Sequence, residues 1–143
     1  MANPAPGFRD RPDHAIALGT PTGRVAVRGA GQGPQVAHSA TAVRLDEQGY
    51  PHRYYVPRSD VAEGALDRSE KTTECPFKGT ATYYHVTVGG TRLENAAWSY
   101  EQPFDEMARI AGHVAFDHDG LEVLAFETTP AGDVFKPGEG SAL

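Results

Sequence analysis

The sequence is poor in cysteine and in long apolar runs, and each scarcity excludes a class of protein. The one cysteine, Cys75, excludes an intramolecular disulfide and every zinc site that needs several cysteines, and it favours a reducing compartment. No apolar run approaches the ~20 residues that a membrane helix needs, and the first residues lack the charged and apolar stretches of a signal peptide. We therefore expect a cytoplasmic protein with no membrane partner.

The sequence is also poor in basic residues and in the motifs that mark metal and nucleotide sites. Thirteen Lys and Arg stand against nineteen Asp and Glu, which gives a net charge of −6, and no basic run exceeds two residues. A nucleic-acid partner is therefore not expected. None of the six histidines has a His-x-His or His-Glu-x-x-His spacing, and the glycine-rich phosphate loops and the Gly-x-Ser-x-Gly motif are absent. We predict neither a metal nor a cofactor.

A length of 143 residues is typical of one domain, and sixteen glycines with eleven prolines indicate many turns rather than long helices. Residues 1–22 contain four prolines and few large apolar side chains, so they are expected to form a flexible arm. Residues 128–143 have a similar composition and are expected to form a flexible tail. The single β domain is then predicted over residues 23–127.

Alternation of apolar and polar residues is the main structural signal within this domain. It predicts strands over residues 23–28 and 36–45. Residues 52–56 are rich in strand formers and stop at a proline, after which residues 58–61 are predicted to form one helical turn. A further strand is expected from residue 65 to residue 68.

Two hairpins and one helix complete the prediction. Residues 81–88 and 91–98 flank a Gly-Gly pair, which supplies the positive φ angles that a two-residue hairpin turn requires. Residues 103–111 have apolar side chains at helical spacing, and Gly112 ends the pattern. The Asp-Gly pair at 119–120 predicts a second hairpin. The fold class is mainly β, a compact antiparallel domain of about eight short strands and one short helix.

The turn-rich segment 72–79 places a thiol, an ammonium and a carboxylate close together in the sequence. A nearby cation favours the thiolate form of cysteine, so Lys78 is a candidate activator of Cys75 as a nucleophile. Free cysteines are among the most buried residue types, so Cys75 is alternatively a small buried side chain beside a solvated Lys78.

The segment 94–103 is the second cluster of polar and aromatic residues. Strict alternation would place Glu94 and Trp98 on one strand face and Asn95 on the other. A face with a carboxylate, a small residue and an indole suits a planar polar ligand. The alternative is a tryptophan packed on the core with Glu94 at its rim.

Four segments follow one another in a characteristic order. They are Arg53-Tyr54-Tyr55-Val56-Pro57, residues 72–84, Glu94-Asn95-Ala96-Ala97-Trp98-Ser99-Tyr100 and residues 110–116. Together they resemble the bacterial and fungal family called domain of unknown function 427, and the resemblance extends over about residues 23–127. The family pattern points to Tyr55, Cys75, Lys78, Gly79, Tyr84, Asn95, Trp98 and Tyr100.

The resemblance implies a β-tent-like architecture similar to that of methionine sulfoxide reductase B and the ligand-binding domain of cereblon. Those relatives usually carry a four-cysteine zinc site, which this chain, with Cys75 alone, does not provide. The resemblance therefore implies a metal-free domain. The family is sometimes labelled nucleotidyltransferase, and neither the motifs nor the charge balance supports that activity.

The leading functional hypothesis is a small-molecule-binding pocket between the Cys75–Lys78 loop and the Glu94–Tyr100 strand. Its predicted ligand-binding residues are Tyr55, Tyr84, Asn95, Trp98 and Tyr100. If the domain is an enzyme, we expect metal-independent chemistry, and the candidate catalytic residues are Cys75, Lys78 and Glu94. The alternative is a noncatalytic protein-interaction or homodimeric domain in which Cys75 and Trp98 are structural.

Overall fold

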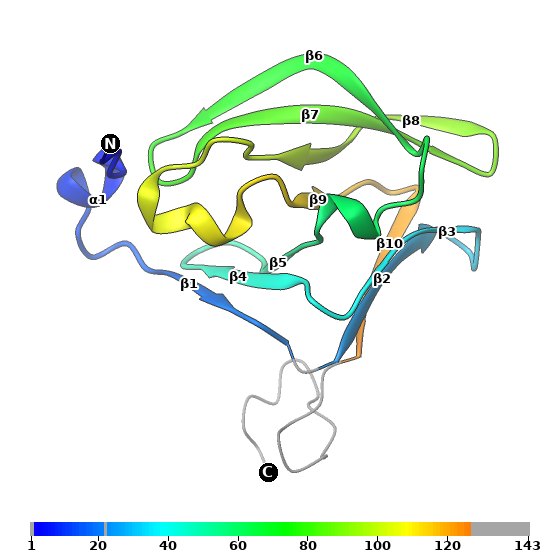
Figure 1. Cartoon of the computed structure of the whole chain (residues 1–143), viewed down its shortest axis with the longest axis horizontal. Helices are drawn as coiled ribbons and strands as arrows, with labels where there is room; N and C mark the ends of the chain where they lie inside the picture. The colour runs from blue at the N-terminus through cyan, green and yellow to red at the C-terminus, as the bar shows by residue number, and fades with distance from the viewer. Residues whose placement is uncertain (1, 22, 127–143) are drawn as a thin grey trace.

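The computed structural model describes residues 2–21 and 23–126, which form a mainly β domain of three antiparallel sheets (Figure 1). The four-stranded sheet has the order β6 (Leu66–Cys75), β7 (Gly79–Val88), β8 (Thr91–Ser99), β9 (Val114–Phe116). The second sheet has the order β1 (Ile16–Gly19), β4 (Val43–Glu47), β5 (Arg53–Tyr55). The third has the order β10 (Leu121–Phe126), β2 (Arg24–Gly29), β3 (Gln35–Ser39). The helices are α1 (Pro6–Asp10) and the 3-10 helices η1 (Arg58–Asp60) and η2 (Asp105–Ile110).

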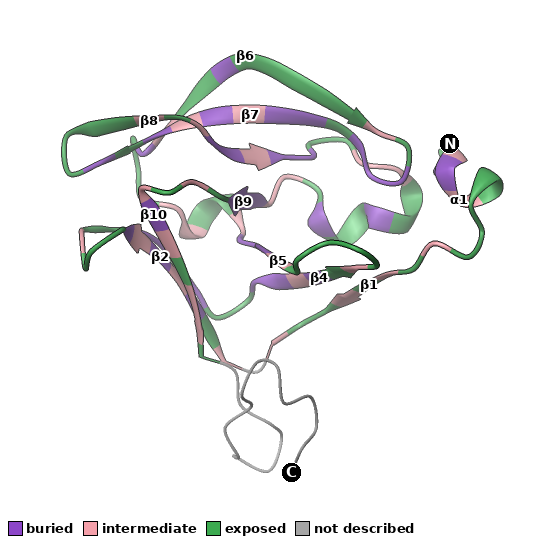
Figure 2. Cartoon of the chain, turned by 180° about the vertical axis from the view of Figure 1, so that it is seen from behind, coloured by how far each residue is buried: buried purple, intermediate pink, exposed green. Residues whose placement is uncertain are grey.

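Strand β7 contributes to two hydrophobic clusters, because successive side chains of a strand point to opposite faces. Tyr84 and Val86 belong to a cluster with Val25 and Val27 of β2. Ala81 belongs to the second cluster, which also contains residues of β4, β5 and η2, and Tyr83 packs against it. Figure 2 shows the resulting contrast between the buried strand β7 and the largely exposed edge strand β6.

The hairpin predicted around the Gly-Gly pair is confirmed as β7 and β8. Gly89 and Gly90 have φ angles of +56° and +79°, the left-handed conformations that glycine adopts without steric cost. Cross-strand pairing places Tyr83 opposite Trp98 and Tyr84 opposite Ala97. The register shifts between Tyr84 and Val86, which marks an irregularity in this hairpin.

Three expectations about single elements differ from the structure. The hairpin predicted across residues 119–120 is wrong, because β9 pairs with β8 whereas β10 pairs with β2, so the turn carries the chain from one sheet to another. The strand expected over 36–45 is two strands, β3 and β4, which join different sheets. The helix expected over 103–111 is the 3-10 helix η2, which is interrupted by the non-helical backbone of Met107.

The N-terminal segment, predicted as a flexible arm over residues 1–22, contributes α1 and β1 to the described structure. Strand β1 pairs with β4 from Ile16 opposite Glu47 to Gly19 opposite Arg44. The amide of Gly7 donates to the carbonyl oxygen of Pro76 at 2.8 Å. The physical reason is that β1 completes the edge of a sheet, where backbone pairing supplies contacts that side-chain composition does not predict. The predicted tail over residues 128–143 lies outside the described residues.

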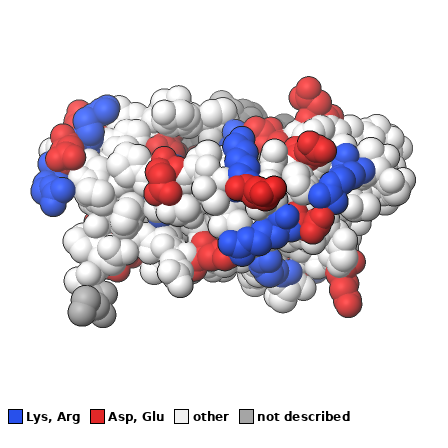
Figure 3. Space-filling view, turned by 90° about the horizontal axis from the view of Figure 1, so that it is seen from above, with Lys and Arg blue, Asp and Glu red and all other residues white. Residues whose placement is uncertain are grey.

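The surface carries charges of both signs in close proximity. Figure 3 shows Lys and Arg side chains interspersed with Asp and Glu on the face seen from above. Arg92 pairs with Asp67 at 2.8 Å, and Arg58 and Arg68 both approach Glu101. No helix within residues 2–21 and 23–126 has the length and apolar character that crossing a membrane requires.

Two buried serines differ in hydrogen bonding, and this predicts opposite effects of their replacement by alanine. The Ser99 hydroxyl is fully buried and has no partner among the described residues, whereas the Ser39 hydroxyl accepts a hydrogen bond from the Thr41 amide at 3.0 Å. Removing an unpaired buried hydroxyl relieves a desolvation cost, so Ser99→Ala is expected to raise the free energy of unfolding by about 1 kcal/mol. Ser39→Ala is expected to lower it by about 1 kcal/mol. Urea unfolding of both variants tests this pair, and a loss of stability in Ser99→Ala would contradict it.

Candidate functional site

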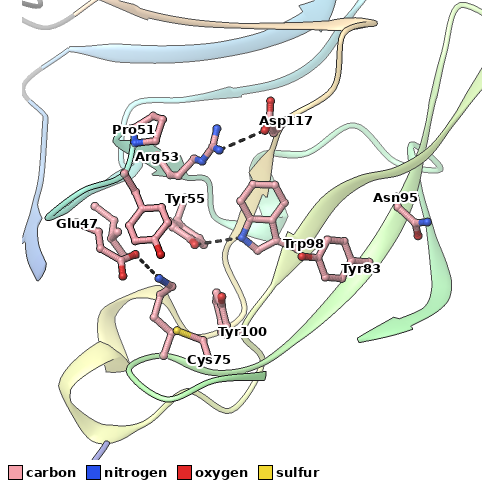
Figure 4. Close-up of a pocket in the computed structure, with 13 residues that line it drawn as sticks. Glu47, Pro51, Arg53, Tyr55, Cys75, Tyr83, Asn95, Trp98, Tyr100 and Asp117 are labelled. Atoms are coloured by element: carbon pink, nitrogen blue, oxygen red, sulfur yellow. Dashed lines mark hydrogen bonds and ion pairs between the residues drawn. The ribbon is translucent and has the colours of Figure 1, made fainter. Parts of the chain in front are cut away.

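A cavity of about 460 Å³ opens between strands β4 and β5 on one side and β7 and β8 on the other (Figure 4). Six of the eight residues carried over from the family pattern contribute to its lining: Tyr55, Cys75, Lys78, Asn95, Trp98 and Tyr100. These residues come from β5 of one sheet and from β6, β8 and the residues that follow those two strands in another sheet. The structure therefore collects most of the predicted cluster around one cavity.

A buried ion pair lies at one end of the cavity. The Lys78 ammonium donates to Glu47 Oε1 at 2.5 Å, and His14 Nε2 lies 2.9 Å from Glu47 Oε2. All three side chains are only about one-tenth exposed. Burial alone would raise the pKa of Glu47, but the hydrogen bonds from Lys78 and His14 outweigh it and lower this pKa below its usual value. Glu47 is therefore an anion held by two donors.

Two tyrosine hydroxyls lie in the middle of the site, and they differ in their hydrogen bonding. The Tyr55 hydroxyl accepts a hydrogen bond from Trp98 Nε1 at 3.2 Å, and burial raises the Tyr55 pKa to about 12. Tyr100 is only 6% exposed and lines the cavity, yet its hydroxyl has no hydrogen-bond partner among the described residues. Burial raises the pKa of Tyr100 as well. Both phenols are therefore neutral at physiological pH, and Tyr100 retains a free donor.

A second ion pair lies at the other end of the cavity. Arg53 Nη2 donates to Asp117 Oδ2 at 3.2 Å, and the Arg53 guanidinium lies over the Trp98 ring, 5.4 Å from its centroid. The Tyr83 ring lies 6.1 Å from the ring of Trp98. Trp98 thus has its orientation fixed by a cation, a hydroxyl and an aromatic ring.

Cys75 ends strand β6 and is partly buried, with its thiol at the cavity. The sequence predicts Lys78 as an activator of Cys75, but the Lys78 ammonium has another partner in the structure. That ammonium donates to Glu47, and no hydrogen bond joins it to Cys75 within the described part of the chain. Both residues line the same cavity, but they belong to different sets of contacts.

Asn95 lies at a local break in strand β8, at the edge of the cavity lining (Figure 4). Its φ angle is +53°, a left-handed conformation that asparagine tolerates better than most residues. Its backbone amide donates to His85 Nδ1 at 3.0 Å, and the Ser69 hydroxyl donates to the side-chain oxygen Asn95 Oδ1 at 2.5 Å. This conformation interrupts the alternation of β8, so Asn95 and Trp98 both line the cavity.

Tyr84 and Glu94 are the two predicted site residues that the cavity lining does not include. Tyr84 is adjacent to Tyr83 in β7, so it points to the opposite face, where its hydroxyl donates to Glu101 and accepts from Arg58. Glu94 is exposed. The expectation that Glu94 and Trp98 share a strand face does not hold, because the left-handed Asn95 lies between them.

A family model described as "Domain of unknown function (DUF427)" matches residues 20–127. The chain belongs to this family. The family resemblance inferred from the four sequence segments is confirmed, and the cavity lies within the matched range except for the contact that His14 makes from outside it. The search of curated proteins found no match.

Four charged residues of the site in this family member were not predicted from the sequence. They are Glu47, Arg53, Asp117 and His14. A signal existed for two of them, because period-two spacing places Arg53 on the face of Tyr55, and Glu47 on the face of buried Leu45. No local pattern indicates Asp117 or His14. Residues 2–21 and 23–126 contain no group of three or more His, Cys, Asp or Glu side chains placed to hold a metal ion.

The lowered pKa of Glu47 predicts how its contribution to stability depends on pH. Glu47→Gln leaves the Lys78 ammonium buried without its counter-ion, so at neutral pH the variant is expected to lose about 3 kcal/mol of unfolding free energy. A carboxyl group whose pKa is depressed by folding stabilises the folded state at pH values above its usual pKa of 4.5. This contribution is lost as the pH falls through the pKa of the folded state. The difference between the two proteins should therefore shrink below pH 4.5.

Urea unfolding at neutral pH and at steps below pH 4.5 measures this difference. Glu63→Gln is the control, because Glu63 is exposed, and it should change stability by less than about 0.5 kcal/mol. A Glu47→Gln deficit that is small at neutral pH, or that grows on acidification, would contradict the assigned ion pair.

Proposed function

We propose that the cavity binds a small, planar, neutral organic molecule that accepts a hydrogen bond from the Tyr100 hydroxyl. The observation that carries this proposal is the state of that hydroxyl: it belongs to a residue that is only 6% exposed, it faces the cavity, and no hydrogen bond joins it to another described residue. Polar groups in the interior of folded proteins almost always have a hydrogen-bond partner. A bound molecule with a carbonyl or similar acceptor would supply it.

The charges around the cavity support a neutral ligand. Lys78 and Arg53 are the two cations of the lining, and each already contacts a carboxylate, that of Glu47 or of Asp117. An anionic ligand would have to compete with Glu47 for a buried ammonium, and a cationic ligand would have to compete with Lys78 for the carboxylate. A neutral molecule avoids both costs.

The remaining walls support a planar shape. Trp98 and Tyr83 present half-buried ring surfaces, and Asn95 adds a side-chain amide nitrogen that donates hydrogen bonds. The cavity volume of about 460 Å³ falls within the ~300–1,000 Å³ that is usual for sites of small molecules. Flat walls with a few fixed polar groups are the features that orient such ligands.

Binding alone needs no catalytic group, and the arrangement supports binding better than turnover. The predicted catalytic residue Lys78 is engaged by Glu47, and Glu94 is not part of the cavity lining. Cys75 is the nucleophile that turnover by this cavity would use, and it is the residue to replace first if an activity is found.

The finer expectations from the sequence accompany this proposal as predictions. They are a β-tent-like architecture, a cytoplasmic location, metal-independent function and, as an alternative role, homodimerisation or binding to another protein. The family match supports the domain assignment on which they depend.

A thermal-shift screen of the full chain against neutral aromatic and heteroaromatic amides tests the proposal. A ligand at 100 times its dissociation constant raises the unfolding free energy by ~2.7 kcal/mol, which gives a measurable rise in melting temperature. Tyr100→Phe removes one hydrogen bond, so binding should weaken about tenfold.

Tyr84→Phe is the matched control for this screen. It also removes a tyrosine hydroxyl, but the Tyr84 side chain lies on the face of β7 that points away from the cavity. It should leave ligand affinity unchanged even if it lowers stability. Equal affinity in Tyr100→Phe and wild type would contradict the assigned contact. A screen without a hit would favour the protein-interaction alternative.

A further inference from the structure

The N-terminal segment lies before the family match but contributes directly to the site. The match begins at residue 20, whereas His14 contacts Glu47 and stacks on Phe77 with ring centroids 4.2 Å apart. We propose that residues 5–19 build a second ligand subsite beside the first cavity, so that the site takes an elongated neutral molecule with two planar parts. This inference rests on the proposed function and specifies the length of its ligand.

A second cavity is present where this subsite is proposed. It has a volume of about 650 Å³, and the N-terminal segment contributes Arg11 and His14 to its lining. Glu47, Tyr50 and Cys75 line both this cavity and the first one. Because three residues are common to both linings, the two cavities adjoin, and one molecule could extend from Trp98 to the wall formed by His14 and Phe77.

The chemistry of the second cavity resembles that of the first. The stacked rings of His14 and Phe77 give it an aromatic wall, and Arg11 and Glu74 add charges of opposite sign. Gln48 is already engaged, because its side-chain oxygen accepts from the Ala15 amide at 3.2 Å. The second part of the ligand is therefore also expected to be planar and neutral overall.

Specific contacts hold the N-terminal segment in place against the site. Ala5 is 4% exposed, and its amide donates to Glu106 Oε1 at 2.8 Å. Arg109 reaches β1 and donates to the carbonyl oxygen of Leu18 at 3.3 Å. The segment is thus attached at both ends, with the second-cavity residues between them.

Gly7 offers a way to displace this segment without changing any residue of either cavity. A Cβ atom at Gly7 would lie 2.7 Å from the Phe77 ring and 2.8 Å from the carbonyl oxygen of Pro76, which is backbone and cannot move freely. Gly7→Ala is therefore expected to push α1 away from the loop that leads to Lys78. Gly19→Ala is the matched control, because a Cβ there meets no atom within 4 Å.

The experiment measures the affinity of the full chain for two sets of probes, neutral one-ring aromatic amides and neutral two-ring aromatic amides. Wild type, Gly19→Ala, Gly7→Ala and His14→Ala are compared by isothermal titration, after circular dichroism has shown that each variant is folded. Two-ring amides should bind wild type and Gly19→Ala equally, and bind Gly7→Ala and His14→Ala about tenfold more weakly or worse. One-ring amides should bind wild type, Gly19→Ala and Gly7→Ala alike, whereas His14→Ala, which also removes a partner of Glu47 in the first cavity, should lose more affinity for two-ring than for one-ring amides.

The outcomes separate this inference from the proposed function. If two-ring amides bind Gly7→Ala and His14→Ala as tightly as wild type, or bind wild type no better than one-ring amides, the second subsite is overturned and the first cavity stands. If neither set binds wild type, the proposed function fails and the inference fails with it. If Gly7→Ala does not fold, the ratio of two-ring to one-ring affinity in His14→Ala decides, and a ratio equal to that of wild type overturns the second subsite.

Discussion

The contact of Glu47 with Lys78 and His14 is the interaction on which the site depends. Three ionisable side chains leave water together, which is tolerable only because each group has a partner at hydrogen-bond distance. Glu47 comes from β4, Lys78 from the loop before β7, and His14 from the segment before β1. One carboxylate therefore links three parts of the chain at the place where the two cavities adjoin.

The main strands could be predicted from the sequence because their signals are local. The Gly-Gly pair at 89–90 fixes a hairpin whose two strands are adjacent in the chain, and the structure has it. The second predicted hairpin used the same kind of turn signal at 119–120, but each flanking strand pairs with a partner further away in the sequence. A turn signal indicates that the chain reverses, and it does not determine which strand becomes the neighbour.

Much of the aromatic part of the site was predictable from the sequence, whereas most of its charged part was not. Tyr55, Trp98 and Tyr100 lie in segments typical of the family, whereas the contact of His14 with Glu47 joins residues 33 positions apart. The orientation of Asn95 depends on hydrogen bonds with Ser69 and His85, which a strict period of two does not include. Side chains placed by long-range contacts leave no periodic trace in the sequence.

Trp98 makes the intrinsic fluorescence of the protein a probe of the first cavity. It is the only tryptophan in the chain, so all of the indole fluorescence comes from the wall of the first cavity. Its ring nitrogen contacts a phenol, its face contacts a guanidinium, and both contacts influence emission from an indole. A molecule that enters the cavity alters this environment, so its binding can be followed in the unmodified protein by the wavelength and intensity of the tryptophan emission.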